Sequence, residues 1–197
     1  MPNSEEAQMI VKPLAEGLAA VQIAAKKGPP PVHLWHPPFC GDIDMRIARD
    51  GTWFHEGSPI GRMPMVNLFS SILRREGDEF FLVTPVEKVR IRVDDAPMLA
   101  VDFEAEGAGE EQRLRFFTKT EDEVVANAAN PIRVALGAEG EPSPYVHVRA
   151  GLEALIDRKS FYRLIELGVH HDHQGTSWFG LWSDGCFFPV IPSLELR

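Results

Sequence analysis

Apolar and polar residues alternate strictly in the first part of the chain, and this alternation predicts half-buried strands. Ile43, Met45 and Ile47 share one face of the first such strand. Asp50-Gly51 then predicts a tight hairpin turn, because both central residues of such a turn take positive φ. Further strands are predicted over residues 79–83, 89–93, 99–103, 112–116, 132–136 and 145–149. Short strands joined by turns indicate an antiparallel sheet.

Helical spacing appears after the first hairpin. Apolar residues from Met65 to Ile72 recur at i, i+3, i+4 and i+7, which is typical of one helical face. Pro64 can open this helix, and Gly77 is placed to cap it. Two further helices are predicted, over residues 13–27 and residues 150–167.

A short pattern occurs twice in the chain, as Ile47–Phe54 and as Leu181–Phe188. Both copies place Asp-Gly between apolar, aromatic-rich runs. The repeat predicts an α+β protein of two related units, each pairing antiparallel hairpin strands with a helix, and clefts between domains commonly bind ligands. The expected division is a helical extension over residues 1–29, a hairpin-helix unit over 30–84 and a sheet-helix unit over 85–197, with the loop at 107–109 as the alternative boundary.

The composition is that of an ordinary globular protein, with 197 residues, 44% hydrophobic and 25% charged. A formal net charge of -9 disfavours non-specific binding to DNA and to anionic membranes. Cys40 and Cys186 are too few for a disulfide framework and lack the spacing of a zinc module. The chain has neither a secretory signal pattern nor a membrane-spanning apolar run, so we expect a cytoplasmic protein.

The run from His170 to His173 is the strongest candidate for metal ligation. In an extended segment alternate residues share a face, so His171 and His173 could bind one ion together. A zinc site would need more ligands, with His147 and His55 as distant candidates. We interpret the run as a solvated loop and expect no metal, no cofactor and no catalytic residue; a metal site is the alternative.

Four arginines form a possible anion-binding stripe on two predicted strands. Arg90 and Arg92 share one face, as do Arg113 and Arg115. The strand between them in sequence carries Asp102 and Glu104, which a meander would place opposite the arginines. We therefore expect these charges to neutralise one another, with an anion site as the alternative.

Five residues around the first hairpin are the best candidates for a ligand site. Gly57 and Ser58 lead towards a predicted helix N-terminus, which attracts anions. Arg62 adds positive charge there, Arg49 precedes the hairpin turn, and Lys88 can join them if the junction folds alongside. We predict charge contacts from the three basic residues and backbone or hydroxyl contacts from Gly57 and Ser58; ordinary turn chemistry is the alternative.

Several runs resemble the signature stretches of a bacterial family, the domain-of-unknown-function family 1285. Those in the N-terminal half are Ala48–Arg62, Leu68–Glu76 and Phe81–Lys88, and those in the C-terminal half are Leu152–Ile156, Phe161–Tyr162 and Trp182–Pro189. The resemblance implies a duplicated core with a pleckstrin-homology-like C-terminal half. It also implies a ligand site between the halves, a nucleotide-like ligand and a role in signalling.

We therefore expect a non-enzymatic binding or sensor protein with a small anionic ligand at the interface of its two units. A protein-interaction module that uses an exposed sheet edge or an aromatic hairpin is the first alternative. A metal-dependent enzyme using His171 and His173 is the second. The architecture makes the first two the better hypotheses, because no catalytic motif accompanies either copy of the Asp-Gly pattern.

Overall fold

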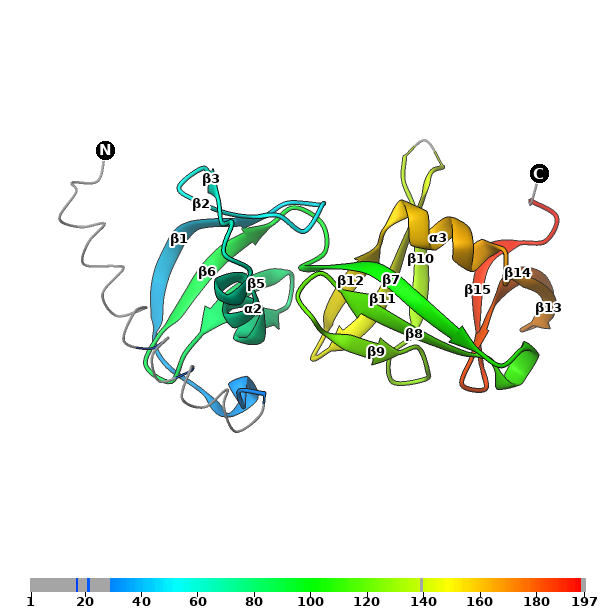
Figure 1. The fold of residues 1–197 in the computed structure, drawn as a ribbon, viewed down its shortest axis with the longest axis horizontal. Helices are drawn as coiled ribbons and strands as arrows, with labels where there is room; N and C mark the ends of the chain where they lie inside the picture. The colour runs from blue at the N-terminus through cyan, green and yellow to red at the C-terminus, as the bar shows by residue number, and fades with distance from the viewer. Residues whose placement is uncertain (1–16, 18–20, 22–28, 139, 196–197) are drawn as a thin grey trace. The chain divides into compact units, whose positions relative to one another are not determined.

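The computed structural model describes Gly17, Val21, residues 29–138 and residues 140–195 (Figure 1). Most of the helix expected over residues 13–27 lies outside the described residues. Gly17 and Val21, which belong to it, are helical and buried. None of the helices in the described part of the chain is both long and apolar enough to span a membrane.

Contacts among the residues divide the chain into two units. The first comprises the described residues up to Ala48 together with Thr52–Asp94. The second comprises Arg49–Gly51 and the described residues from Asp95 onward. The boundary expected near Thr84–Pro85 lies within the first unit, between two of its strands.

The first unit is one six-stranded sheet with a helix. A short 3-10 helix, η1 (Val32–Leu34), precedes it, and its elements in chain order are β1 (Phe39–Ile47), β2 (Trp53–His55), β3 (Ser58–Pro59), α2 (Met63–Ser71), β4 (Leu73–Glu76), β5 (Glu79–Val83) and β6 (Lys88–Val93). The strand order is β3-β2-β1-β6-β5-β4. β1 and β6 pair in parallel, and the other neighbours pair antiparallel.

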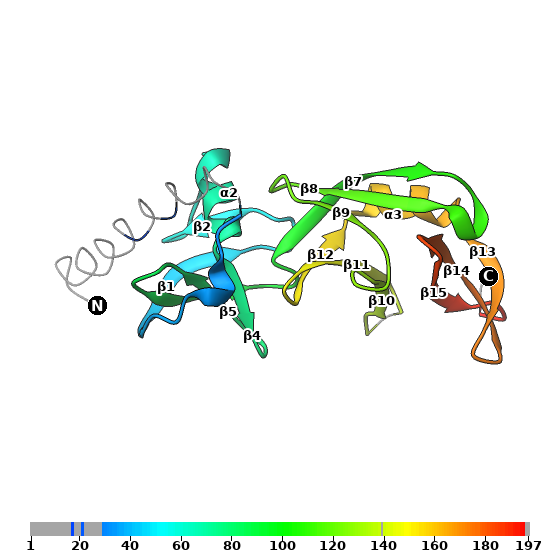
Figure 2. The ribbon, with the colours of Figure 1, turned by 90° about the horizontal axis from the view of Figure 1, so that it is seen from below.

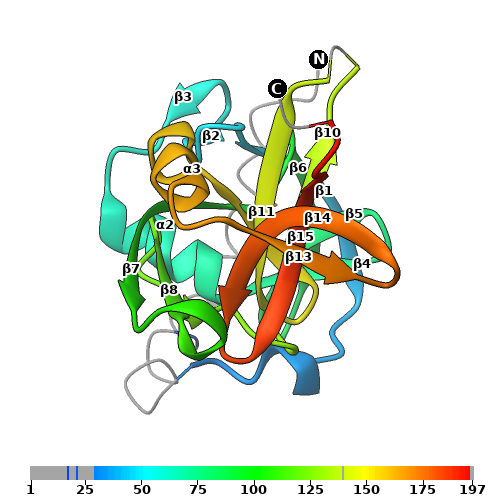
Figure 3. The ribbon, with the colours of Figure 1, turned by 90° about the vertical axis from the view of Figure 1, so that its right-hand side faces the viewer.

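The second unit has a six-stranded sheet, a helix and a smaller sheet. The first sheet contains β7 (Met98–Glu106), β8 (Arg113–Thr118), β9 (Glu123–Val125), β10 (Ile132–Leu136), β11 (Pro142–Arg149) and β12 (Leu152–Ile156), with η2 (Gly109–Glu111) before β8. The helix α3 (Arg158–Ile165) lies alongside β7 (Figure 2). The smaller antiparallel sheet follows as β13 (Val169–His173), β14 (Thr176–Ser183) and β15 (Cys186–Pro192) (Figure 3).

The two large sheets have the same topology. The second sheet has the order β10-β11-β12-β7-β8-β9, which repeats the order of the first when its strands are numbered from one to six. In each, the first strand pairs in parallel with the sixth, as β1 with β6 and β7 with β12. Each sheet is thus two three-stranded meanders joined along one parallel pair. The expected α+β fold of two related units is confirmed, although its sheets are mixed rather than purely antiparallel.

The two Asp-Gly turns, however, are not equivalent positions of this duplication. Asp50-Gly51 joins the first and second strands of the first sheet. The corresponding connection in the second sheet runs through η2, whereas Asp184-Gly185 joins β14 to β15 of the additional small sheet. The two turns also differ in form. Asp184 and Gly185 both take positive φ in a two-residue turn, as predicted, whereas in the first connection, over residues 48–52, Gly51 takes positive φ and Asp50 does not. The sequence repeat therefore does not mark a shared place in the fold.

The expected helix after Pro64 is shorter than its apolar pattern predicts. α2 begins at Met63, with Pro64 in its first turn, and ends at Ser71. The next residues form β4, because Leu73 pairs with Leu82 and both are buried in the sheet. Gly77 is consequently a hairpin residue with φ +62° rather than a helix cap.

The expected helix over residues 150–167 is wrong in its first third. Leu152–Ile156 forms β12, which lies between β11 and β7 in the middle of the sheet. Leu, Glu and Ala favour helices, but burial between two hydrogen-bonded neighbours outweighs a propensity of a few tenths of a kcal/mol per residue. Asp157 then caps α3, accepting a hydrogen bond from the Ser160 N–H at 2.7 Å.

Each unit has its own core. In the first, the rings of Trp53 on β2 and Phe69 on α2 stack 6.1 Å apart, and both side chains are buried. In the second, Phe103 and Phe116 on neighbouring strands lie 5.9 Å apart. Ring pairs of this kind add to the hydrophobic contribution of their buried area.

Candidate functional site

Gly57 and Ser58 lie in the exposed hairpin between β2 and β3. Gly57 has φ +76°, so glycine is favoured by the turn itself. Ser58 begins β3 and lies opposite His55. Both residues are exposed.

Arg62 and Lys88 lie at separate places in the first unit. Arg62 is the exposed N-cap residue of α2, and its side chain makes no capping hydrogen bond. Lys88 donates to Glu76 Oε2 at 2.8 Å, and its Nζ lies 4.7 Å from the centroid of the Phe81 ring. Lys88 pairs with the start of β1, whereas Ser58 lies beside β2 next to the end of β1. These two points on β1 are six residue positions apart. At ~3.3 Å per residue, Lys88 and Ser58 are therefore separated by roughly 20 Å along the strand.

Arg49, the remaining predicted contact, takes part in a polar cluster of the second unit. Its Nη2 donates to Ser143 Oγ at 2.8 Å. Its Nη1 forms an ion pair with Asp95 Oδ2 at 3.1 Å, without the geometry of a hydrogen bond. Asp95 Oδ1 accepts a hydrogen bond from the Tyr145 hydroxyl at 2.7 Å. Burial, together with this bond, raises the pKa of Tyr145 above its usual range, so the phenol stays a neutral donor.

Arg49 also lines a cavity of about 590 Å³ in the second unit. Pockets for small organic ligands typically span roughly 300–1,000 Å³. The apolar part of the lining consists of Leu99, Pro142, Pro144, Leu155, Ile156 and Phe161. The polar part consists of Arg49, Asp50, Glu141, Ser143, Asp157, Arg158 and Tyr162. An apolar cavity bordered by a few charged groups is the usual form of a ligand site.

The end of β12 and the start of α3 position the second arginine of the cavity. Asp157 N–H donates to Ala100 O at 2.9 Å, which holds the strand-to-helix junction against β7. Arg158 and Tyr162 stand one turn apart on α3, a spacing at which side chains meet. Arg158 Nε and Nη2 both donate to the Tyr162 hydroxyl, at 3.0 and 2.9 Å.

The two arginines of the cavity differ in how far their charges are compensated. Arg49 has Asp95 as its counter-ion. Among the described residues, neither a hydrogen bond nor an ion pair joins Arg158 to a carboxylate, and its partner Tyr162 is neutral and 57% exposed. Arg158 is therefore the cation of this cavity whose charge is available to a ligand.

A second hollow, of about 380 Å³, lies on the first unit and is lined by two arginines, Arg90 and Arg92, together with three carboxylate residues. Arg90 there forms ion pairs with both Asp42 and Glu79. Its hydrogen bond holds the pKa of the Asp42 carboxyl below its usual range. Asp44 adds a further carboxylate to the lining. This hollow is smaller than the cavity that contains Arg158 and has fewer apolar residues in its lining, so it is a weaker candidate for an organic ligand.

The four arginines of the predicted stripe lie on two different sheets, Arg90 and Arg92 on β6 and Arg113 and Arg115 on β8. Three of them form ion pairs with partners other than the expected strand: Arg90–Asp42, Arg113–Asp184 and Arg115–Glu123. Asp102 instead pairs with Arg163 of α3, which holds the pKa of Asp102 below its usual range. Glu104 does lie opposite Arg115 in the register.

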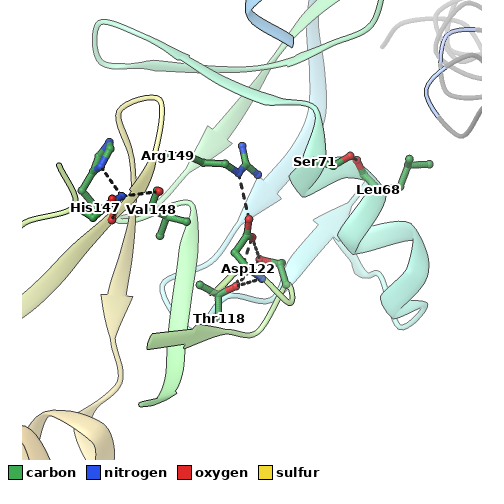
Figure 4. A network of polar contacts seen from close by, with 9 residues as sticks. Leu68, Ser71, Thr118, Asp122, His147, Val148 and Arg149 are labelled. Atoms are coloured by element: carbon green, nitrogen blue, oxygen red, sulfur yellow. Dashed lines mark hydrogen bonds and ion pairs between the residues drawn. The ribbon is translucent and has the colours of Figure 1, made fainter. Parts of the chain in front are cut away.

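The polar network around Asp122 fixes a turn of the second unit (Figure 4). Its carboxylate accepts from the Thr120 hydroxyl at 3.0 Å and from Arg149 Nε at 3.2 Å, and the Thr118 hydroxyl accepts from the Asp122 N–H. Nearby on β11, the His147 ring accepts a hydrogen bond from the Gly151 N–H at 3.0 Å. His147, a candidate metal ligand in the sequence, thus has a structural partner in the β11–β12 turn.

The histidine run forms β13 rather than the expected loop. His171 and His173 do share a face, where they pack on aromatic rings: His171 lies 5.0 Å from Trp182 and 4.8 Å from Phe187, centroid to centroid. His170 lies on the other face, against Phe179 and Ser193. No group of three or more potential metal ligands gathers within the part of the chain that the structure describes.

Sequence reasoning missed Arg158, Tyr162 and Asp95. The i, i+4 spacing of Arg158 and Tyr162 in a predicted helix was the available signal for that pair. No local pattern relates either of them to Arg49, because the cavity is formed by segments far apart in the chain.

Comparisons with known proteins identify the family. The family model described as "Domain of unknown function (DUF1285), N-terminal domain" matches residues 30–96. The family model described as "Protein of unknown function (DUF1285), C-terminal domain" matches residues 97–190. No match was found among curated proteins.

Two solved structures are similar to this chain. A DUF1285 family protein from Silicibacter pomeroyi DSS-3 is 66% identical, with a TM-score of 0.81, over 86% of this chain and 91% of that chain. A DUF1285 family protein from Shewanella baltica OS155 is 30% identical, with a TM-score of 0.49, over 62% of this chain and 90% of that chain. The two domain matches and the two-unit architecture agree, and the chain belongs to the DUF1285 family.

Proposed function

We propose that this protein is a binding or sensor protein that holds a small anionic ligand in the cavity of its second unit. The observation that carries the proposal is the guanidinium of Arg158, which borders an apolar cavity of about 590 Å³. Its side-chain partners among the described residues are the hydroxyl and the ring of Tyr162, not a carboxylate. An anionic group binds such a guanidinium through charge-assisted hydrogen bonds, about twice as strong as neutral ones.

The rest of the cavity supports a ligand with an apolar body. Leu155, Ile156 and Phe161 are buried side chains of β12 and α3 that contribute to its lining. Burial of apolar ligand surface against them would contribute roughly 25 cal/mol per Å². Arg49 and Ser143, already hydrogen-bonded to each other, form a preorganised polar part of the same lining.

This proposal retains Arg49 from the predicted ligand contacts and adds Arg158. Gly57, Ser58, Arg62 and Lys88, the ligand site between the two units, and a nucleotide-like ligand all stay predictions. A signalling role, in which occupancy of the cavity is the signal, is likewise an extension of the proposal.

A thermal-shift titration of the full chain tests the proposal. The probes are AMP and an aromatic monocarboxylate, each up to about 10 mM. Ligand that binds only the native state stabilises it by RT ln(1 + [L]/Kd), about 2.7 kcal/mol at 100 times Kd, so the melting temperature should rise. The rise should be lost in Arg158→Gln.

Lys159→Gln is the matched control, because Lys159 is exposed on the same helix and does not line the cavity. It removes the same charge and should keep the shift. Absence of any Arg158-dependent shift with both probe classes would overturn the proposal.

A protein-interaction module is the second candidate, and the aromatic face of β13–β15 favours it. Trp182 and Phe187, with centroids 5.3 Å apart, are only half-buried there alongside His171 and His173. A partner that co-purifies in stoichiometric amount without added ligand, and that Trp182→Ala releases while the fold persists, would favour this function over a ligand-binding one.

A further inference from the structure

We infer that the ligand of this cavity is a monocarboxylate carried on a flat apolar body, an inference that rests on the proposed function. The first reason is the charge of the lining. Three carboxylate residues, Asp50, Glu141 and Asp157, line the same cavity as Arg158. Arg158 offers one positive charge to a ligand, and a second or third negative charge on the ligand would need a second cation without a carboxylate partner among the described residues.

Arg49 does not supply that second cation, because Asp95 lies 3.1 Å from its Nη1. A phosphomonoester carries about 1.5 to 2 negative charges at neutral pH, whereas a carboxylate carries one. The charge of the lining therefore matches a carboxylate better than a phosphate monoester or a nucleoside polyphosphate.

The second reason is the direction of the Arg158 donors. Its Nε–H and Nη2–H converge on a single oxygen, the Tyr162 hydroxyl, at 3.0 and 2.9 Å. The same edge of a guanidinium binds the two oxygens of a planar carboxylate through parallel hydrogen bonds. A carboxylate can thus replace the phenol oxygen on this edge, so that each donor has its own charged acceptor oxygen.

The third reason is the nature of the remaining surface. Leu99, Leu155 and Phe161 offer apolar side chains to the body of the ligand. The Tyr162 ring, released from Arg158, is an exposed aromatic face that can pack on a flat ring. Arg158 and Tyr162 together would then determine specificity, one for the carboxylate and one for the shape of the body.

Three probes that share one flat body separate the effect of the ligand's charge from the effect of its shape: 1-naphthoate, the neutral 1-naphthamide and the doubly charged 1-naphthyl phosphate. In isothermal titration of the full chain we expect 1-naphthoate to bind most tightly, with the amide and the phosphate each about tenfold weaker or more, a ratio that corresponds to ~1.4 kcal/mol. Arg158→Gln should lower naphthoate affinity about tenfold, and Arg158→Lys should recover little of it, because Lys lacks the planar fork. Lys159→Gln should leave it unchanged.

The outcomes distinguish this inference from the proposed function. Tighter binding of 1-naphthyl phosphate or AMP, lost in Arg158→Gln, would overturn the monocarboxylate and leave the anion-binding function standing. Equal binding of naphthoate and naphthamide, or no binding of the three naphthyl probes, would overturn the inference. If AMP also fails to bind, the proposed function falls with it.

Discussion

At the scale of single residues, Gly180 in the middle of β14 is a glycine with no room for a side chain. The Phe187 ring lies over its backbone, and a methyl group there would come 2.6 Å from Phe187 Cζ and would also clash with the Phe188 carbonyl oxygen. A backbone atom cannot yield as the end of a side chain can. The aromatic face of the small sheet therefore depends on a residue that contributes no side chain.

We expect Gly180→Ala to lower the free energy of unfolding by about 1–3 kcal/mol, the usual cost of overpacking. Urea denaturation measures it through the midpoint at constant slope. Gly61→Ala is the control, because open space surrounds Gly61 and its φ lies outside the left-handed region. Equal midpoints for the two variants would contradict this account of β14.

Glu87 is the buried acid of the first unit, only 2% exposed, and its Oε1 has no hydrogen-bond partner among the described residues. Burial raises the pKa of this carboxyl above its usual range. The folded state thus holds the proton more tightly than the unfolded chain does. Protonation of Glu87 therefore adds to the free energy of unfolding. This contribution is fully present below the pKa of the unfolded state, and it is lost as the pH rises through the pKa of the folded state.

Glu87→Gln, neutral at every pH, should therefore be more stable than the wild type at neutral pH, and the difference should shrink as the pH approaches about 4, near the ordinary pKa of glutamate. Chemical denaturation across this range measures it. The exposed Glu111→Gln should show no such trend. A difference that does not depend on pH would show that Glu87 does not titrate in this way.

At the scale of elements, one buried hydroxyl joins the small sheet to the large sheet of the second unit. Ser183 of β14 is fully buried; its Oγ accepts from the Leu114 N–H at 2.9 Å and donates to Ala126 O at 2.7 Å. Both partners are backbone groups at or beside strands β8 and β9. Their hydrogen bonds explain how β14 is held against β8.

Ser183→Ala should destabilise the protein by roughly 1–3 kcal/mol, because it leaves a buried donor and a buried acceptor without partners. Thermal and urea unfolding give the value. Ser177→Ala on the same strand is the comparison: Ser177 is exposed and hydrogen-bonds to another exposed hydroxyl, Ser193, so water can replace the lost bond. An effect of Ser177→Ala as large as that of Ser183→Ala would refute the distinction.

At the scale of the whole molecule, 29 acidic residues against 20 lysines and arginines give a formal charge of -9. Most of the arginines that could form a basic surface are in ion pairs, such as Arg133 with Glu153 and Arg163 with Asp102. Because these ion pairs neutralise the arginines locally, the electrostatic field of the protein at long range is negative and repels polyanions.

We expect no detectable binding to duplex DNA at physiological salt, where non-specific binders typically have Kd values of 10⁻⁴ to 10⁻⁶ M. Fluorescence anisotropy with a labelled duplex measures it. Reducing the salt should produce at most weak binding, because few phosphates could be neutralised. A micromolar Kd at physiological salt would contradict this reasoning from charge.

Prediction from sequence succeeded where the signal was local. Strand β1 follows from the alternation of Ile43, Met45 and Ile47, because the period of a strand is a property of neighbouring residues. The chain does reverse at Asp50-Gly51, but the connection spans residues 48–52 and Asp50 does not take the positive φ expected of a two-residue turn. The duplication was inferred correctly, although of the two Asp-Gly turns that suggested it, only Asp50-Gly51 lies in a duplicated sheet, and Asp184-Gly185 lies in the small third sheet.

The candidate site could be predicted from the sequence only in part. Arg49 was identified by its place next to a turn, and it lines the cavity. Arg158 and Tyr162 carried a local signal, their i, i+4 spacing, but nothing local connects α3 to the segment that contains Ser143. A cavity depends on side chains from several segments, and no short pattern records which segments meet.

The sequence by itself determined most of the strands and the net charge, since these depend on residues close together in the chain or on composition alone. Only the tertiary structure decided that Leu152–Ile156 is a strand, that each large sheet closes on a parallel pair, and that Arg49 and Arg158 border one cavity. The physical reason is that burial and strand pairing are long-range terms. They outweigh helix propensities of a few tenths of a kcal/mol per residue, and they depend on partners that the local sequence does not specify.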